Sequence, residues 1–512
     1  MQKKHNLSLF ILSFFFLSHQ LSAQDLDSLK IEISSLNAFS SKGYLPLWMS
    51  ANRHGLYDDS QANYILKGAI YGEKQISKKL KFSGELDLLL YNNSISQSRA
   101  QQAYLQLDYG KFRFWGGLKE HTMSSHAPDI GSGSFSISGN ARPIPTIAFG
   151  FPEYTDLPWT NGFVQFKGMF EQSWLEKDRY ISKAMLHSKN FYLKTNKLPV
   201  NLQVGMTHNV VFGGTHPVHG KLPPYNFKDY LTILIPAGNS GNSPIEGENT
   251  NQAGTHRGMF DFGLTANIKD WELTLYHQKP FEDLSGYIRF FEQNKDHFTG
   301  IVAKSKSKKI ISEFTYEWIY TKWQSGPGLP DPNAEHPNNE SNYGYRFGGR
   351  DDYYNSMHYL NGYTFHRYSI GTPLFITTDR ANYYFDGNVQ GTQYNEQFVS
   401  NRMIAHHLGI KGWLSKWISY RALFTYTENF GTYTTENNGR YNWDSMNPDR
   451  PPYNDGSTTY QFDGGLKQYY TMIEISSPLP FWKNMSAHST FAYDFGELSH
   501  NFGMIIGIAY TL

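Results

Sequence analysis

The sequence lacks cysteine, and beyond its first 23 residues it also lacks any run of 18 apolar residues. The absence of cysteine excludes a disulfide framework, a thiolate metal site and a cysteine nucleophile. The absence of a long apolar run excludes a transmembrane helix, which needs about 20 such residues. Strands are therefore the only elements with which the mature chain could cross a membrane.

An excess of charge of one sign is missing as well. The chain has 46 basic and 45 acidic residues, and no long basic run occurs. Because nucleic-acid-binding proteins usually carry a basic patch or stripe, we expect no nucleic-acid partner. The short motifs G-x-S-x-G and H-E-x-x-H and a glycine-rich phosphate loop followed by lysine are also absent. We therefore expect a protein that is not an enzyme and that uses no cofactor and no metal.

The N-terminus has the layout of a secretory signal peptide. Lys3 and Lys4 precede an apolar run from 7 to 17, and small residues lead up to Ala23. We expect cleavage after Ala23, which leaves residues 24–512 as a single domain. No cysteine follows this site, so a lipoprotein anchor is excluded. The chain is predicted to be exported.

The composition combines many aromatic rings with a polar average. The sequence contains 36 Tyr, 36 Phe and 11 Trp, yet its apolar fraction is 39% and its mean hydropathy is −0.53. An outer-membrane β-barrel explains this combination, because rings occupy its lipid face and two aromatic girdles while its lumen and outer loops are polar.

Apolar and polar residues alternate along 80–91, which has the sequence LKFSGELDLLLY. Alternation with a period of two predicts a strand, and a strand that crosses a bilayer takes about 9–11 tilted residues. The same pattern recurs in 103–109, 112–116, 200–207, 260–268, 313–320, 404–410, 418–426 and 502–512. We predict an all-β, antiparallel transmembrane barrel of roughly 16–18 strands, whose last strand closes against the first.

The connections between these strands are of two kinds. Short ones rich in Lys, Asp and Pro, such as 76–79 and 196–199, tend to alternate with long ones rich in Gly, Asn and Pro, such as 212–257 and 429–464. Bacterial barrels have short periplasmic turns and long extracellular loops. We therefore expect the long connections to lie at the cell surface.

Two segments depart from the strand pattern. Residues 119–161 are rich in Gly, Ser and Pro, and closely spaced prolines disfavour a central strand. We expect this segment to fold inward as a plug. Residues 26–40 are predicted to form a short helix on the periplasmic side.

Several long connections mix aromatic and polar side chains. Such mixtures suit glycans, because rings contact the C–H faces of sugars while polar groups contact their hydroxyls. The alternative is that these side chains only pack the loops. The candidates for polysaccharide binding are Tyr345, Arg346, Tyr353, Tyr354, Arg440, Tyr441, Trp443 and Asp444.

Four motifs carry a family resemblance: WGGLKEH at 115–121, SGNARPIPTI at 138–147, PWTNG at 158–162 and FKG at 166–168. Their order and their residues resemble the Wzi family of capsule-assembly proteins, and the Ala23–Gln24 junction resembles members from the Bacteroidetes. The resemblance implies an outer-membrane barrel of 18 strands with a small periplasmic helical element and a plugged lumen. It also implies a non-catalytic, lectin-like protein that holds exported capsular polysaccharide at the cell surface. Within the plug segment we assign a lumen motif, formed by His121, His126, Asn140, Arg142, Pro143 and Pro145.

Two other functions stay open at this point. A porin or specific channel would require an open lumen, and a barrel-embedded enzyme acting on lipid would require a Ser–His or acid–His pair at the lipid boundary. In every case the expected location is the outer membrane, with the loops at the cell surface. Besides a surface polysaccharide, the expected partners are outer-membrane lipid, lipopolysaccharide and the barrel-assembly machinery, and the expected state is a monomer.

The assignment of the two faces of the predicted strand at 80–91, one to lipid and one to the lumen, can be tested by substitution. Leu88→Arg would place a cation against lipid, and we expect it to cost about 2–4 kcal/mol near the membrane midplane. Asp87→Asn, on the lumen face, should be tolerated. The amount of folded barrel in membranes, read from heat-dependent gel migration, measures both. Equal tolerance of the two substitutions would contradict the assignment of Leu88 to the lipid face and of Asp87 to the lumen face.

Overall fold

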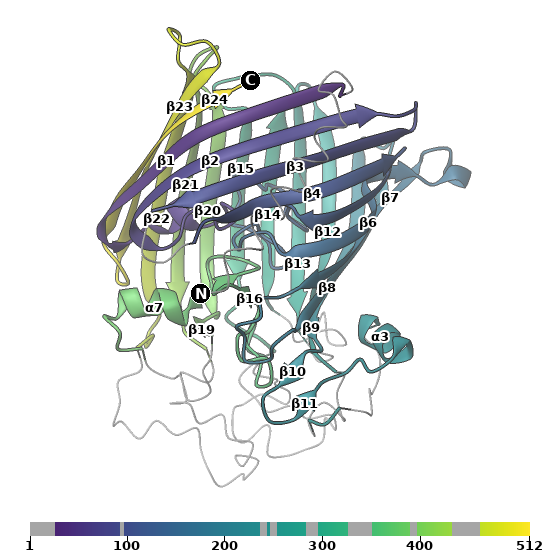
Figure 1. Cartoon of the computed structure of the whole chain (residues 1–512), viewed down its shortest axis with the longest axis vertical. Helices are drawn as coiled ribbons and strands as arrows, with labels where there is room; N and C mark the ends of the chain where they lie inside the picture. The colour runs from purple at the N-terminus through teal and green to yellow at the C-terminus, as the bar shows by residue number, and fades with distance from the viewer. Residues whose placement is uncertain are drawn as a thin grey trace, which may run out of the picture.

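The computed structural model describes residues 26–92, 97–235, 243–245, 253–282, 295–325, 351–389, 397–432 and 461–512. Within them, 18 antiparallel strands form one closed barrel (Figure 1). Its strands are β1 (Ser28–Tyr44), β2 (Ser60–Gln75), β3 (Leu80–Tyr91), β4 (Arg99–Tyr109), β5 (Phe112–Leu118), β6 (Pro145–Asp156), β7 (Val164–Trp174), β8 (Met185–Thr195), β9 (Val200–Phe212), β12 (Thr255–Ile268), β13 (Trp271–Phe281), β14 (His297–Ser305), β15 (Glu313–Tyr320), β20 (Met403–Trp413), β21 (Ser419–Asn429), β22 (Leu466–Pro478), β23 (Met485–Gly496) and β24 (Asn501–Thr511).

The remaining elements are short and lie in the connections. The described residues form three two-stranded sheets: β10 (Thr215–His216) with β11 (Gly220–Lys221), β16 (Thr364–Phe365) with β17 (Tyr368–Ser369), and β18 (Ile376–Thr377) with β19 (Phe398–Ser400). The described α-helices are α2 (Leu47–Ser50), α3 (Phe227–Leu234) and α7 (Thr378–Tyr384). In the described part of the chain, no helix combines the length and the apolar character needed to cross a membrane.

The last strand closes the barrel on the first. β24 pairs with β1 from Glu32 opposite Thr511 to Ser40 opposite Gly503, which confirms the predicted closure. The helix predicted for 26–40 is wrong, because these residues belong to β1. Leu29, Ile31 and Ile33 alternate with polar residues, and pairing on both sides with β2 and β24 fixes this period of two.

The two faces of the wall differ as the alternation predicts. Leu88 lies on the outer face and is exposed, whereas its neighbour Asp87 is buried in the lumen. Asp87 forms an ion pair with Lys67 (3.2 Å) and accepts a hydrogen bond from Gln102 (3.3 Å). Asp87→Asn therefore removes an ion pair whose carboxylate is buried. We expect it to cost on the order of 1 kcal/mol, still less than Leu88→Arg.

Long and short connections lie at opposite ends of the barrel. The short turns and the C-terminus share one end, and the long connections share the other (Figure 1). Exposed aromatic side chains, namely Trp159, Trp417, Phe481 and Trp482, mark turns at the short end. This arrangement is that of an outer-membrane barrel with its short turns in the periplasm and its long connections at the cell surface. α2, α3 and α7 all belong to connections at the surface end.

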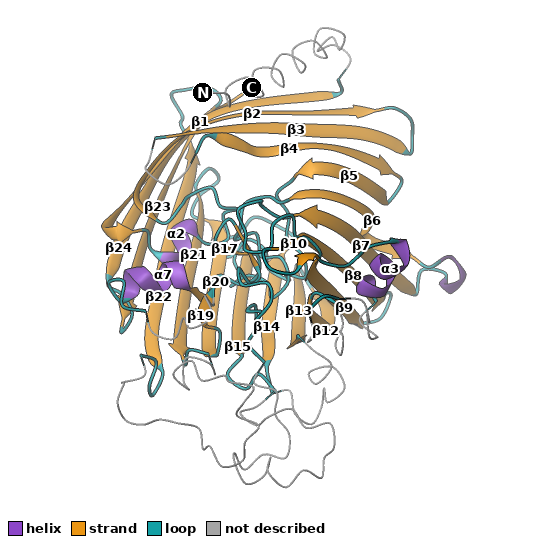
Figure 2. Ribbon diagram, turned by 60° about the horizontal axis from the view of Figure 1, so that its bottom comes forward, coloured by secondary structure: helices purple, strands orange, loops and turns teal. Residues whose placement is uncertain are grey.

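Inward-folded segments fill the lumen, among them the β1–β2 connection with Leu45, Trp48 and Met49 and two longer segments (Figure 2). One is 119–144, which covers most of the predicted plug. Its remainder was assigned wrongly, because β6 in the wall begins at Pro145, and a proline is tolerated as the first residue of a strand. The second segment is 351–377, from the connection between β15 and β20. Phe135 of the first packs against Tyr353 and Tyr354 of the second, with ring centroids 5.2 and 5.0 Å apart.

The tip of the first segment is bound to the inner wall. His407 of β20 donates a hydrogen bond to the Ile130 carbonyl (2.8 Å), and Arg421 of β21 donates to the Asp129 carbonyl (2.9 Å). Lys411 of β20 forms an ion pair with the Asp129 carboxylate. Gly409 lies between these contacts, where an added Cβ would overlap the Ile130 carbonyl oxygen. Only glycine lets the tip approach this closely.

We expect Gly409→Val to push the tip off the wall and to raise ion conductance in planar bilayers. The barrel itself should persist, since the wall hydrogen bonds of β20 are unchanged. Gly68→Ala is the matched control, because a Cβ there has no neighbour within 4 Å. Unchanged conductance in Gly409→Val would show that this contact does not hold the plug.

Candidate functional site

A cavity of about 340 Å³ opens at the surface end of the barrel. Its walls come from α7, from the β16–β17 hairpin, and from the connection between β1 and β2 that contains α2. This volume lies within the range of small-molecule sites, about 300–1,000 Å³. The polar and aromatic residues that line it are Ser50, Asp59, Asn140, His366, Arg367, Tyr368, Ser369, Phe375, Thr377, Asp379, Arg380, Asn382 and Tyr383.

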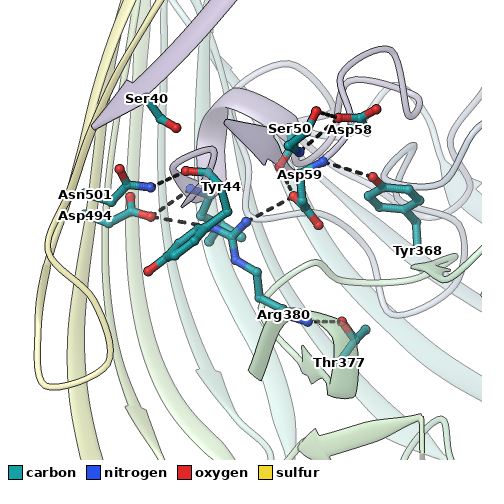
Figure 3. A network of polar contacts seen from close by, with 12 residues as sticks. Ser40, Tyr44, Ser50, Asp58, Asp59, Tyr368, Thr377, Arg380, Asp494 and Asn501 are labelled. Carbon is teal, nitrogen blue, oxygen red and sulfur yellow. Dashed lines mark hydrogen bonds and ion pairs between the residues drawn. The ribbon is translucent and has the colours of Figure 1, made fainter. Parts of the chain in front are cut away.

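Arg380 holds the α7 side of the cavity in place (Figure 3). Its Nη1 donates to Asp59 Oδ1 (3.0 Å), and its Nη2 lies 3.7 Å from Asp494 Oδ2 on β23. The helix begins after Thr377, whose hydroxyl accepts a hydrogen bond from the Arg380 backbone N–H (3.3 Å). One buried guanidinium thus joins α7 to the barrel wall and to the β1–β2 connection.

Asp59 orients the opposite wall. Its carboxylate accepts a hydrogen bond from the Ser50 hydroxyl (2.9 Å), besides that from Arg380. Its backbone N–H donates to the Tyr368 hydroxyl (3.2 Å), which fixes this ring at the edge of the cavity (Figure 3). This hydrogen bond to the hydroxyl holds the Tyr368 side chain in the position in which it lines the cavity.

The groups at the opening of the cavity are more exposed. Arg367 is 71% exposed in its side chain and forms an ion pair with Asp379 at the start of α7. Asn382 is exposed on the same helix, and the Tyr383 ring packs on Tyr44 with a centroid distance of 4.8 Å. Amide, carboxylate and guanidinium groups thus surround an aromatic surface at the entrance.

The charges of the cavity balance. Arg380 is paired with Asp59, and Arg367 with Asp379. His366 adds no charge near neutral pH, because burial and the nearby Arg142 and Arg99 lower its pKa to about 4. A balanced site of this kind suits an uncharged polyhydroxylated ligand better than a phosphate, which would need an excess of cations. Among the described residues, no group of three or more His, Asp or Glu could hold a metal ion.

A family model for the capsule assembly protein Wzi matches residues 55–389. The chain belongs to the Wzi family. Among solved structures it is similar to Wzi of Escherichia coli, an outer-membrane protein involved in group 1 capsule assembly and a carbohydrate-binding β-barrel, at 12% identity. That match covers 97% of this chain and 86% of the other, with a TM-score of 0.54. At such low identity it shows a shared fold.

Two further solved structures match less well. OpdL of Pseudomonas aeruginosa is 8% identical, with 95% of this chain and 98% of that chain covered. OccK3 (OpdO) of the same species is 10% identical, with 97% and 99% covered. Both have a TM-score of 0.44. No curated protein sequence matches this Wzi-family chain.

The structure divides the lumen motif of this Wzi-family protein into two groups. Asn140 lines the cavity and donates a hydrogen bond to the Ser369 carbonyl (3.0 Å). Arg142 lies deeper, with its guanidinium 5.6 Å from the Phe365 ring centroid, and burial together with Arg99 lowers its pKa to about 10. Pro143 is buried beside it, and Pro145 starts β6. Of these four residues, Asn140 is the one that lines the cavity.

His121 and His126 lie away from the cavity and bind the wall. His121 Nε2 donates to Glu171 on β7 (3.0 Å). His126 Nε2 donates to Asp261 on β12 (3.0 Å), and its ring stacks on Tyr276 with centroids 4.2 Å apart. Both histidines therefore serve to anchor the plug.

Two of the aromatic candidates chosen for polysaccharide binding, Tyr353 and Tyr354, lie within the described residues, and they do not line the cavity. Tyr353 and Tyr354 are 1% and 0% exposed, and their hydroxyls donate to Asp296 and to the Phe135 carbonyl. They are core residues of the plug, so their assignment to a glycan surface is corrected. The other six candidates, Tyr345, Arg346, Arg440, Tyr441, Trp443 and Asp444, lie outside the described residues.

Sequence reasoning missed the residues that build the site. Arg380, Asn382 and Tyr383 lie in TTDRANYY at 377–384, which has the same aromatic and polar mixture that selected the other candidates. Thr377 followed by Asp379 is also a helix-start signal. Asp59 has no such signal, because its role depends on a partner 321 positions away.

We expect Arg380→Met to detach α7, since it leaves Asp59 and the buried Asp494 without their cation. Breaking a buried pair in this way costs about 3–5 kcal/mol. Arg367→Met is the matched control, because its exposed pair with Asp379 should contribute less than about 1 kcal/mol. Hydrogen exchange of residues 378–384 measures both. Equal exchange in the two variants would contradict the role assigned to Arg380.

Proposed function

We propose that this protein binds exported capsular polysaccharide at the cell surface and supports capsule assembly without catalysing a reaction. The observation that carries the proposal is the charge-balanced cavity at the surface end of a plugged Wzi-family barrel. The cavity combines rings with hydrogen-bonding groups of both kinds, which is the combination that sugar residues need. The carbohydrate-binding property of Wzi from E. coli supports the same assignment.

The residues have complementary roles in this proposal. Tyr368 and Tyr383 offer ring surfaces to the C–H faces of a sugar. Asp59 and Asp379 accept hydrogen bonds from hydroxyl groups, and Asn382 can both donate and accept. Each cavity binds a sugar weakly, but a polymer meets many copies of the protein on one cell. Retention of the polymer therefore needs only modest affinity at each site.

Two features weigh against the alternatives. The segments 119–144 and 351–377 fill the lumen, which disfavours a channel. Both carboxylates of the cavity are engaged by arginines, so neither is placed as a general acid. Outer-membrane lipid, lipopolysaccharide and the barrel-assembly machinery stay expected partners, and a monomer stays the expected state.

The proposal is tested in a deletion strain. We expect a thinner capsule by staining, with more free polysaccharide in the medium. An unchanged capsule with altered uptake of small solutes would favour the channel instead.

Binding to the cavity is tested with purified protein and polysaccharide from the same cells. Tyr383→Ala removes a ring at the opening, and we expect affinity to fall about two- to thirteenfold, as for the loss of an aromatic contact worth about 0.5–1.5 kcal/mol. Trp159→Ala, at the periplasmic end, should bind like the unaltered protein. Equal affinity of the two variants would place the polymer elsewhere.

A further inference from the structure

α3 lies outside the barrel, against the outer wall of β9 (Figures 1 and 2). Alternate residues of β9 face outward, and Val200, Leu202 and Val204 are exposed on this face. Farther along the same face, Val210 and Phe212 are completely buried. They pack with Ile233 of α3 in a small apolar cluster. The helix therefore covers a part of the outer wall that would otherwise be bare.

The covered part of the wall is polar. Lys189 of β8 is paired in register with His208 of β9, and His187 and His256 lie on either side of Val210. By the alternation of side chains, all of these residues face outward. The outer wall here carries a lysine and three histidines at positions that are apolar elsewhere on the same strands.

α3 supplies hydrogen-bond partners for this polar wall. Lys189 donates to the Leu234 carbonyl at the end of the helix. Tyr230 donates its hydroxyl hydrogen to Gln172 of β7 (2.9 Å). His208 and His256 share a hydrogen bond with each other (3.0 Å). The helix thus provides hydrogen-bond partners for Lys189 and Gln172 of the wall.

The polar part of the outer wall begins within the apolar layer of the membrane. From Val200 to His208 the strand advances about 26 Å at ~3.3 Å per residue. Strands of such barrels tilt by about 35–45°, so this advance spans roughly 20 Å along the membrane normal, less than the apolar band of about 25 Å. His208 and its neighbours thus lie within the outer part of that band.

The side of α3 that borders the wall is apolar and exposed. Phe227, Leu231 and Ile235 follow each other at intervals of four residues and are 73%, 44% and 59% exposed. At about 100° per residue, they form a stripe next to the buried residue Leu234. Lys228 and Asp229 lie on the far side of the stripe. The helix is therefore amphipathic, with an apolar flank that continues the outer wall.

We propose that α3 lies in the outer leaflet of the outer membrane, where the stripe of Phe227, Leu231 and Ile235 contacts acyl chains. On the outward face of β8, Phe191 lies two residues from Lys189 and is also exposed. Lys228 and Asp229 then face the headgroups and water. An interfacial helix with this division of faces is a known way to bind a membrane surface. This proposal does not depend on polysaccharide binding.

The absence of cysteine allows a clean test with single labels in the full-length protein in lipid nanodiscs. A nitroxide is attached to Leu231→Cys, and its collision rates with oxygen and with a water-soluble nickel chelate are compared. Leu264→Cys on the lipid-facing wall and Met357→Cys, an exposed residue of the surface connection, are the two references. Lys228→Cys probes the polar side of the same helix.

We expect the label at 231 to resemble that at 264, with frequent oxygen collisions and little contact with nickel. The label at 228 should contact nickel more often. A label at 231 that behaves like that at 357 would place the helix in water and overturn the proposal. A disulfide-linked dimer of unlabelled Leu231→Cys in membranes would also overturn it, because the stripe would then contact a second copy.

Discussion

The structure depends on one constraint of the bilayer, which is that every backbone N–H and C=O group within it must be paired inside the protein. The pairing of β24 with β1 meets this constraint by removing both sheet edges. Because all neighbouring strands are antiparallel, the connections divide strictly between two ends. The long connections are gathered at the cell surface, and only there does the chain have enough residues to build a site.

A second consequence concerns the inside of the barrel. A wall of 18 strands encloses more space than its own side chains can fill, so the lumen either holds water, as in porins, or is filled by additional chain. Here the segments 119–144 and 351–377 fill it and pack against each other through Phe135, Tyr353 and Tyr354. The cavity rests on this filled lumen. Asn140 and Tyr368 belong to the two segments, and Arg380 follows the second, so the plug is also the support of the candidate site.

The sequence predicted the wall better than the plug for a physical reason. Strands in contact with lipid on one side and with a polar lumen on the other must alternate, as in 80–91, and that pattern is local. The segment 26–40 shows the limit. We predict a helix there from the sequence, although Leu29, Ile31 and Ile33 alternate with polar residues as in a strand. The plug has no period. Its second half, 351–377, resembles any long loop, and only contacts with distant residues reveal that it is buried. The same holds for the site, where Arg380 joins Asp59 and Asp494 across long separations in sequence.

The most direct test of this account is hydrogen exchange of the protein with and without oligosaccharides prepared from the cell's own capsule. The account predicts slower exchange on binding in 366–369 and 378–384, the two segments that frame the cavity. Exchange in the periplasmic turns, such as 158–162 and 479–484, should not change. Protection confined to other parts of the surface end, with these two segments unaffected, would contradict the claim that the cavity between them is the binding site.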